Sequence, residues 1–207
     1  AYLILGSSLG ADQSIDLSAA DYGFVGENHG DRAGTQVASA GDVDGDGLSD
    51  ILVSAPYNDD VDKDTGKTYL ILGASLSTPG TYSLSTADYT FVGPDYEEHV
   101  GMSIASAGDV DGDGLDDIIL GAPFNSVDRL SGHLYEGMTY LVLASSLDSS
   151  APMNLSIADY RFLGEDPNDY SGYSVAGSGD IDGDGLADLL IGAGYRHASD
   201  GRVYVVL

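Results

Sequence analysis

The sequence contains no cysteine and no tryptophan, and only seven of its 207 residues are Lys or Arg. Without cysteine, a disulfide, a zinc–thiolate site and thiol chemistry are all excluded. Nucleic acids and anionic membrane surfaces are bound through basic patches, so the scarcity of cationic side chains argues against both classes of partner. No apolar run is long enough to cross a bilayer as a helix, which argues against direct membrane insertion.

Acidic residues, by contrast, are abundant, and 34 Asp and Glu give the chain a formal net charge of -27. Hydrophobic residues make up 43% of the sequence, including 14 Tyr, which is typical of a globular rather than a disordered protein. Many of the acids fall in a nine-residue segment that the chain repeats. Its three copies are Asp42–Asp50, Asp109–Asp117 and Asp180–Asp188.

All three segments read D-x-D-G-D-G-L-x-D. Four carboxylates within nine residues repel one another unless a cation lies among them. Oxygen ligands in a flexible, glycine-containing loop suit Ca²⁺ better than Mg²⁺, because Mg²⁺ takes fewer protein ligands and requires stricter octahedral geometry. The sequence therefore predicts three Ca²⁺ sites, one in each repeat.

An EF-hand loop also opens with this acidic pattern, but it needs a bidentate Glu at position 12 and a helix on either side. Position 12 is here Val53, Leu120 or Ile191, within apolar runs typical of a strand buried on both faces. The EF-hand interpretation therefore fails. Because such loops stay loaded where Ca²⁺ is about millimolar, we expect the protein to be extracellular, either secreted or at a cell surface.

A longer repeat surrounds each acidic segment. Tyr2, Tyr69, Tyr140 and Tyr204 each begin a short Tyr-Leu-Ile-Leu-like run. Each unit adds a strand-like run of small residues before the acidic segment, an apolar run directly after it, and an aromatic run of the Tyr-x-Phe type at its end. Several short strands in a long repeat indicate an array of small sheets.

Sheets that are buried on both faces need a neighbour on either side, and radial repetition provides one. We therefore predict an all-β fold, a β-propeller whose blades have four antiparallel strands, with about three repeats in a partial ring. Residues 1–33 would supply the third and fourth strands of a preceding blade, residues 34–93 and 94–164 two complete blades, and residues 165–207 a partial blade. Propellers have roughly 4 to 8 blades. The chain is therefore either part of a longer propeller, which we favour, or it self-associates to complete the ring.

Three motif elements carry a resemblance to a known family. They are Phe24-Val25-Gly26, the acidic segment that follows, and Gly121-Ala122-Pro123. Their order resembles the FG-GAP repeat of integrin alpha-chain propellers, of bacterial surface and secreted proteins, and of the accessory domain of glycosylphosphatidylinositol-specific phospholipase D. Ser54 departs from the pattern by replacing the first Gly of Gly-Ala-Pro, and Gly194 departs by replacing its Pro.

The resemblance implies a ligand set for each Ca²⁺: four Asp side chains and the backbone carbonyl at loop position 7. In this sequence the implied ligands are Asp42, Asp44, Asp46, Leu48 and Asp50; Asp109, Asp111, Asp113, Leu115 and Asp117; and Asp180, Asp182, Asp184, Leu186 and Asp188. Because each loop joins the two innermost strands of a blade, we expect the ion to be structural.

The resemblance also implies a protein or glycan partner on the face opposite the acidic loops. Exposed aromatic side chains often anchor such contacts. The candidate partner-binding residues in the loops of that face are Tyr57, Tyr96, Phe124, Tyr170 and Tyr195. The alternative is that Tyr57, Phe124 and Tyr195, which occupy matching places, cap the core of each blade.

Nothing in the sequence marks an active site. It has no H-E-x-x-H, P-loop or G-x-S-x-G motif, and its histidines lie in polar segments: His29, His99, His133 and His197. We therefore predict no catalytic residue, and a role for the chain in cell adhesion or protein interaction as an integrin-alpha-like segment. The alternatives are a non-catalytic accessory propeller of a secreted hydrolase, as in the phospholipase D architecture, and an enzyme that uses loop acids or histidines.

Overall fold

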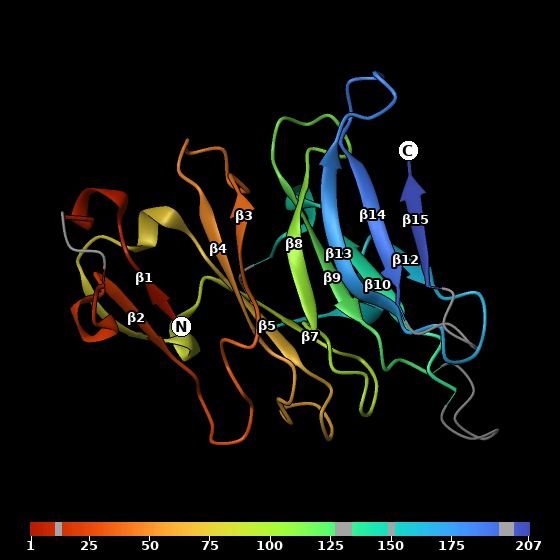
Figure 1. Cartoon of the computed structure of the whole chain (residues 1–207), viewed down its shortest axis with the longest axis horizontal. Helices are drawn as coiled ribbons and strands as arrows, with labels where there is room; N and C mark the ends of the chain where they lie inside the picture. The colour runs from red at the N-terminus through yellow and green to blue at the C-terminus, as the bar shows by residue number, and fades with distance from the viewer. Residues whose placement is uncertain (11–13, 127–133, 149–151, 195–200) are drawn as a thin grey trace.

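Four small β-sheets stand side by side in the order of the chain, from the N-terminal sheet at the left of Figure 1 to the C-terminal sheet at the right. The computed structural model describes residues 1–10, 14–126, 134–148, 152–194 and 201–207. Within those residues every regular element is a strand or a three-residue 3₁₀ turn. The predicted all-β class is therefore confirmed.

The two middle sheets contain the four predicted strand types in the predicted order. In the second sheet these strands are β3 (Val37–Gly41), β4 (Asp50–Ala55), β5 (Lys67–Ile71) and β7 (Tyr89–Val92). In the third sheet they are β8 (Ser103–Gly108), β9 (Asp117–Ala122), β10 (Met138–Val142) and β12 (Tyr160–Leu163). Neighbouring strands of each set pair antiparallel, as a propeller blade requires.

The two outer sheets hold partial sets. The first contains β1 (Tyr2–Leu3), β2 (Tyr22–Val25) and β6 (Gly80–Ser83), and the fourth contains β13 (Ser171–Gly179), β14 (Asp188–Ala193) and β15 (Arg202–Val206). The first sheet therefore has the outer strand types and the fourth sheet has the inner ones. This open arrangement agrees with the predicted partial ring.

Two strands that the sequence did not predict connect neighbouring sheets, because each pairs with a strand of the preceding sheet. β6 pairs in parallel with β2, with Phe24 opposite Tyr82. β11 (Met153–Asn154) pairs in parallel with β7 in the same way, with Met153 opposite Phe91. Each places part of one predicted unit in the sheet of the unit before it, so the unit boundaries drawn from the sequence stay a prediction.

Small residues let the inner strands of neighbouring sheets approach closely. Ala40 and Ala107 are fully buried, and a Cβ on Gly177 would lie only 2.6 Å from the carbonyl oxygen of Ala107. The second strands are apolar and buried on both faces, with Leu52 and Ile119 inaccessible to solvent. Both features match the strand types that the sequence predicted.

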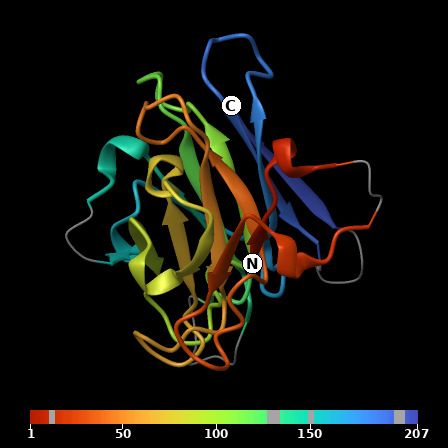
Figure 2. The same cartoon turned by 90° about the vertical axis from the view of Figure 1, so that its left-hand side faces the viewer.

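The connections divide between two ends of the molecule. The acidic loops, which join β3 to β4, β8 to β9 and β13 to β14, all lie at the upper end in Figures 1 and 2. The loops that enter the first strand of a set, and the described residues of the loops that leave β4 and β9, lie at the opposite end. Among the described residues, the metal-binding and partner-binding candidates therefore lie on opposite faces.

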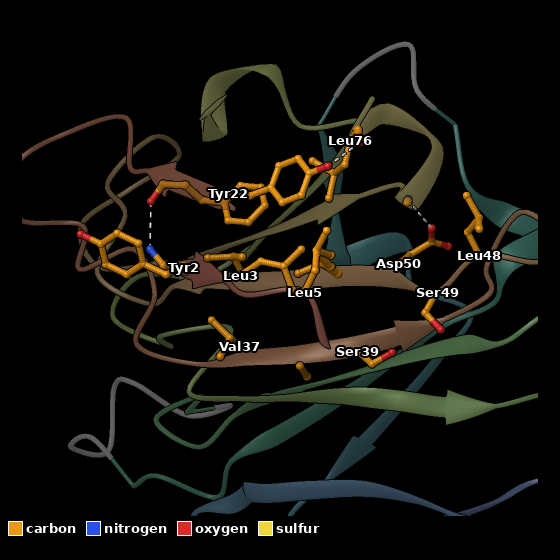
Figure 3. A pocket seen from close by; sticks show the side chains of 16 residues that line it. Tyr2, Leu3, Leu5, Tyr22, Val37, Ser39, Leu48, Ser49, Asp50 and Leu76 are labelled. Carbon is orange, nitrogen blue, oxygen red and sulfur yellow. Dashed lines mark hydrogen bonds between the residues drawn. The ribbon is translucent and has the colours of Figure 1, made fainter. Parts of the chain in front are cut away.

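An apolar cavity of about 640 Å³ lies between the first and second sheets (Figure 3). Its lining includes four labelled aliphatic side chains, those of Leu3, Val37, Leu48 and Leu76. Among the described residues, the first sheet has no counterparts of β3 and β4. No helical segment of the described residues is long and apolar enough to cross a membrane.

Candidate metal sites and opposite face

Each acidic loop gathers three carboxylates at the mouth of a hairpin. One oxygen from each of Asp42, Asp44 and Asp50 lies within 4.8 Å of the other two. The same holds for two further groups, Asp109, Asp111 and Asp117, and Asp180, Asp182 and Asp188. The first and last acids of each group are held close together because one follows the first strand and the other begins the second.

The carboxylate of the first Asp of each loop accepts hydrogen bonds from backbone amides of the same loop. In the first loop, Oδ1 of Asp42 accepts a bond from the N–H of Gly45 at 2.8 Å, and its Oδ2 accepts one from the N–H of Gly47 at 2.9 Å. Both glycines have left-handed φ, +75° and +86°, which favours glycine at these positions. The same pattern surrounds Asp109, with bonds from Gly112 and Gly114. The loop is thus shaped around this carboxylate.

The last Asp of each loop is the most buried. Asp50 is 1% exposed and accepts bonds from the N–H of Val43 at 2.9 Å and of Gly73 at 2.8 Å. Asp117 is fully buried, and this burial raises its pKa to about 6, with the charges of Asp111 and Asp113 adding to the rise. Burial likewise raises the pKa of Asp50. A cation among the carboxylates would compensate both effects.

The remaining acid of each loop, at loop position 5, lies outside the group of three carboxylates. Asp46, Asp113 and Asp184 each accept a bond from the N–H two residues later, at 2.7 to 2.9 Å. Those amides belong to Leu48, Leu115 and Leu186, whose carbonyls are the remaining predicted ligands. Three of the five predicted ligands per loop are therefore clustered, and the other two lie in the adjoining turn. Every side-chain atom that could bind a metal here is a carboxylate oxygen, so the residues fit a hard divalent cation.

At the opposite end, three of the predicted partner-binding residues belong to one continuous row of rings. Tyr57 contacts His99 with ring centroids 4.7 Å apart, and His99 contacts Phe124 at 5.1 Å. Phe124 in turn contacts Tyr135 and Tyr170, each at 5.6 Å. These five half-buried rings form what we term the aromatic row.

The other two predicted residues are not in the row. Tyr96 lies beside Lys63, whose Nζ is 5.4 Å from the ring centroid. Tyr195 lies outside the described residues. The sequence did not predict His99 or Tyr135 as members. A signal for His99 was available, because Arg32, His99 and Tyr170 occupy matching places directly after an acidic residue.

Those three matching residues share a backbone conformation that explains the row. Arg32, His99 and Tyr170 have left-handed φ of 55°, 54° and 52°. Their side chains pack against the rings of neighbouring loops: the guanidinium carbon of Arg32 lies 4.0 Å from the Tyr57 centroid. His99 also has its Nδ1 3.0 Å from the carbonyl oxygen of Pro56. These contacts support a packing role for His99 rather than a catalytic one. His29 is exposed, and His133 and His197 lie outside the described residues.

The sequence pattern of the FG-GAP repeat matches residues 33–71, 100–141 and 171–206, which is more than half of the chain. The chain belongs to the FG-GAP repeat family. Each matched FG-GAP segment begins just before or at a first strand, contains one acidic loop and ends at the third strand. The resemblance drawn from the sequence is therefore confirmed.

Several integrin alpha chains are similar to this FG-GAP protein. Integrin alpha-5 of Xenopus laevis is 30% identical over 177 residues, covering 83% of this chain and 16% of the relative. Integrin alpha-PS2 of Drosophila melanogaster is 28% identical over 178 residues, covering 83% of this chain and 12% of the relative. Integrin alpha pat-2 of Caenorhabditis briggsae is 30% identical over 182 residues, covering 82% of this chain and 14% of the relative. This FG-GAP chain thus spans at most about a sixth of these relatives.

Proposed function

We propose that this chain is a calcium-binding segment of an extracellular, integrin-alpha-like β-propeller that acts in cell adhesion or protein interaction. One observation carries the proposal: three hairpin loops at the same end of the molecule each bring three Asp carboxylates within 4.8 Å. The similarity to integrin alpha chains supports the adhesion role over an accessory role in a secreted hydrolase. We propose no catalytic residue.

The bound ion would be Ca²⁺ with a structural role. Ca²⁺ takes six to eight oxygen ligands in flexible geometry. In the first loop Asp42, Asp44 and Asp50 would bind it, with Asp46 and the Leu48 carbonyl completing the set. The equivalent residues of the other two loops would do the same. Each ion would fix the hairpin between the two innermost strands of its sheet and neutralise charge that otherwise opposes folding.

Calcium titration of the metal-free chain by isothermal calorimetry tests this proposal. We expect three Ca²⁺ to bind, and Mg²⁺ at the same concentration to bind much more weakly. With free Ca²⁺ at about 100 times Kd, each site would stabilise the fold by about 2.7 kcal/mol. EDTA should therefore lower the melting temperature by many degrees. A melt that is the same in EDTA and in excess Ca²⁺ would show that the ion has no structural role.

On the opposite end, we propose that the aromatic row and Tyr96 contact a protein or glycan partner. The support is that the rings are half-buried, so each keeps an accessible edge, and that the row spans loops of successive repeats. We also propose that further blades of a longer propeller, rather than a second copy of this chain, cover the cavity between the first two sheets. The small share of each relative that the chain spans supports this choice.

A further inference from the structure

The first two acidic loops are hydrogen-bonded to each other across the boundary between repeats. Asp116, the eighth residue of the second loop, donates its N–H to the carbonyl oxygen of Asp42 at 3.0 Å. Asp42 returns a bond from its own N–H to Oδ2 of Asp116 at 2.8 Å. Asp116 is not among the predicted metal ligands of its own loop, so its carboxylate serves the neighbouring loop instead.

Close packing leaves this pair little freedom. A Cβ on Gly41 would lie 2.5 Å from the Cβ of Asp116 and 2.1 Å from its Oδ2. Gly41 also has a left-handed φ of +82°. Leu115 approaches the same loop, with its Cδ2 3.0 Å from where a Cβ on Gly45 would be. The second loop therefore supports the first through two consecutive residues.

The pair also forms a short path between two proposed metal sites. Leu115 and Asp117 flank Asp116 and are both proposed ligands of the second Ca²⁺. Asp42, which is joined to Asp116 by both hydrogen bonds, is a proposed ligand of the first Ca²⁺. An ion in the second loop would hold the backbone on either side of Asp116, and so would hold the Asp42 backbone that Asp116 clamps.

We propose that Asp116 is a positioning residue that couples the first and second calcium sites. Occupation of the second site raises the affinity of the first, and linkage requires that the first raise the affinity of the second by the same factor. This inference rests on the proposed calcium binding. It adds that the sites fill cooperatively and not as three independent loops.

The next boundary provides an internal comparison. Ala187 stands at the place of Asp116, and its N–H donates to the carbonyl oxygen of Asp109 at 2.8 Å. Its Cβ lies 2.7 Å from where a Cβ on Gly108 would be, so the packing is the same. Alanine has no carboxylate to accept a bond from the Asp109 amide. The second and third sites are therefore coupled more weakly than the first and second.

The test uses the whole chain with the third site disabled by Asp182→Ala. Calcium affinity of the first loop is followed through the NMR amide signals of Gly45 and Gly47, with Asp111→Ala added to disable the second site. Couplings between sites typically amount to about 5- to 150-fold, and we expect the first-site affinity to fall at least about fivefold when Asp111 is replaced. In an Asp116→Ala background only the backbone bond to Asp42 remains, so Asp111→Ala should lower the first-site affinity by a clearly smaller factor.

Two further variants separate coupling from a general structural role. Asp116→Asn keeps an oxygen that can accept the Asp42 bond, so it should preserve coupling. Ala187→Asp should strengthen coupling between the second and third sites. A readout without metal is hydrogen exchange at the Asp42 amide, which should speed up in Asp116→Ala and not in Asp116→Asn.

The outcomes distinguish this inference from the calcium proposal. If the unmodified chain takes up no Ca²⁺, both are wrong. If the chain binds three Ca²⁺ and Asp111→Ala does not change the affinity of the first site, only the coupling proposal is wrong. Coupling that persists at full strength in Asp116→Ala would overturn the role of Asp116.

Discussion

The carboxylate of Glu98 accepts a hydrogen bond from Nδ2 of Asn125 at 2.7 Å. The preceding repeat contains the same bond, from Asn58 to Asp31, also at 2.7 Å. All four side chains are buried. The acid lies in the loop before a first strand and the amide in the loop after a second strand, so each bond ties together the two kinds of loop that form the face opposite the metal sites.

Glu98 should make stability depend on pH. Burial raises its pKa to about 7, and the charge of Asp95 adds to the rise. Because this pKa lies above the ordinary value of 4.5, the folded chain retains a proton that the unfolded chain releases between pH 4.5 and 7. Stability from this group therefore falls as pH rises through that window. The loss is at most about 3.5 kcal/mol, since the pKa rises by about 2.5 units and one unit corresponds to about 1.4 kcal/mol.

Urea unfolding of the wild type and Glu98→Gln in EDTA, at pH 5 and at pH 8, checks this expectation. The Glu98 carboxylate also accepts a bond from the hydroxyl of Tyr140 at 3.1 Å. Glutamine keeps an oxygen for the bonds from Asn125 and Tyr140 but does not titrate. The variant should gain stability relative to the wild type at pH 8 and not at pH 5. Titration of the acidic-loop carboxylates cancels in the comparison, so an equal pH dependence in both proteins would contradict the prediction.

The strand order could be predicted because each strand type has its own local signature. Small residues mark the inner strand, unbroken apolar runs mark β4, β9 and β14, and Tyr-x-Phe marks the fourth strand. β6 and β11 had no such signature. Gly80–Ser83 shows no apolar alternation, and its position is set by pairing with β2, more than fifty residues earlier. A pairing at that distance leaves no mark in a local pattern.

The same distinction applies to the sites. The acidic clusters could be predicted because all the carboxylates of a cluster lie within nine residues. The aromatic row could be predicted only in part, since His99 joins it through contacts with Tyr57 and Phe124 from two different loops. The hydrogen bond between the Asp42 amide and the Asp116 carboxylate joins residues 74 positions apart. In the sequence, Asp116 is only the variable eighth residue of its loop, so nothing local predicts this bond.

Two ligand substitutions in the second loop should separate metal binding from loop structure. Asp113 is exposed, so Asp113→Ala should reduce the Ca²⁺-dependent rise in melting temperature and leave the melt in EDTA nearly unchanged. Asp117 also accepts a bond from the N–H of the half-buried Val110 and one from the N–H of the buried Ala144. Asp117→Ala should therefore lower the melting temperature both with Ca²⁺ and in EDTA, because the amides lose their acceptor.

Calorimetric melts of both variants in excess Ca²⁺ and in EDTA make the comparison. Asp159→Ala is a control on an acid outside the loops: it caps the turn after β10 through the N–H of Leu143, and should leave the Ca²⁺-dependent shift intact. If Asp113→Ala lowers both melts as much as Asp117→Ala does, the two residues do not differ as the structure indicates.

Gly121 should not tolerate the serine that its counterpart carries. Ser54 occupies the matching place in the preceding repeat, where its hydroxyl accepts a bond from the N–H of Gln36. A Cβ on Gly121, however, would lie 2.0 Å from the carbonyl oxygen of Gly172 and 2.3 Å from Oγ of Ser103. Ser103 already donates to that carbonyl at 2.7 Å. Gly121→Ser should cost at least about 1–3 kcal/mol, as overpacking does.

Urea denaturation measures that cost, with Ser54→Gly as the matched control. The control loses one hydrogen bond and should cost about 1 kcal/mol. Adding Ser103→Ala to Gly121→Ser should not restore stability, because the clash with the Gly172 backbone remains. Full restoration would show that only the hydroxyl opposes serine at this position.

The contact between His99 and Phe124 should be energetically coupled, since ring pairs in this geometry contribute about 0.5–1.5 kcal/mol beyond area burial. A double-mutant cycle with His99→Ala and Phe124→Ala should yield a coupling in that range by urea unfolding. Phe124→Ala alone should cost less than the roughly 3–5 kcal/mol of a fully buried Phe, because the ring is half-buried.

Tyr96→Ala serves as the reference, because Tyr96 lies outside the row and contacts Lys63 instead. Combined with Phe124→Ala it should give a coupling near zero, as expected for residues without shared contacts. If the cycle with His99 is also near zero, the rings do not support one another, and their alignment would have to be maintained for a partner alone. A measurable coupling would show that the two rings stabilise each other in the folded chain before any partner binds, and rings already held in place lose less conformational entropy on binding.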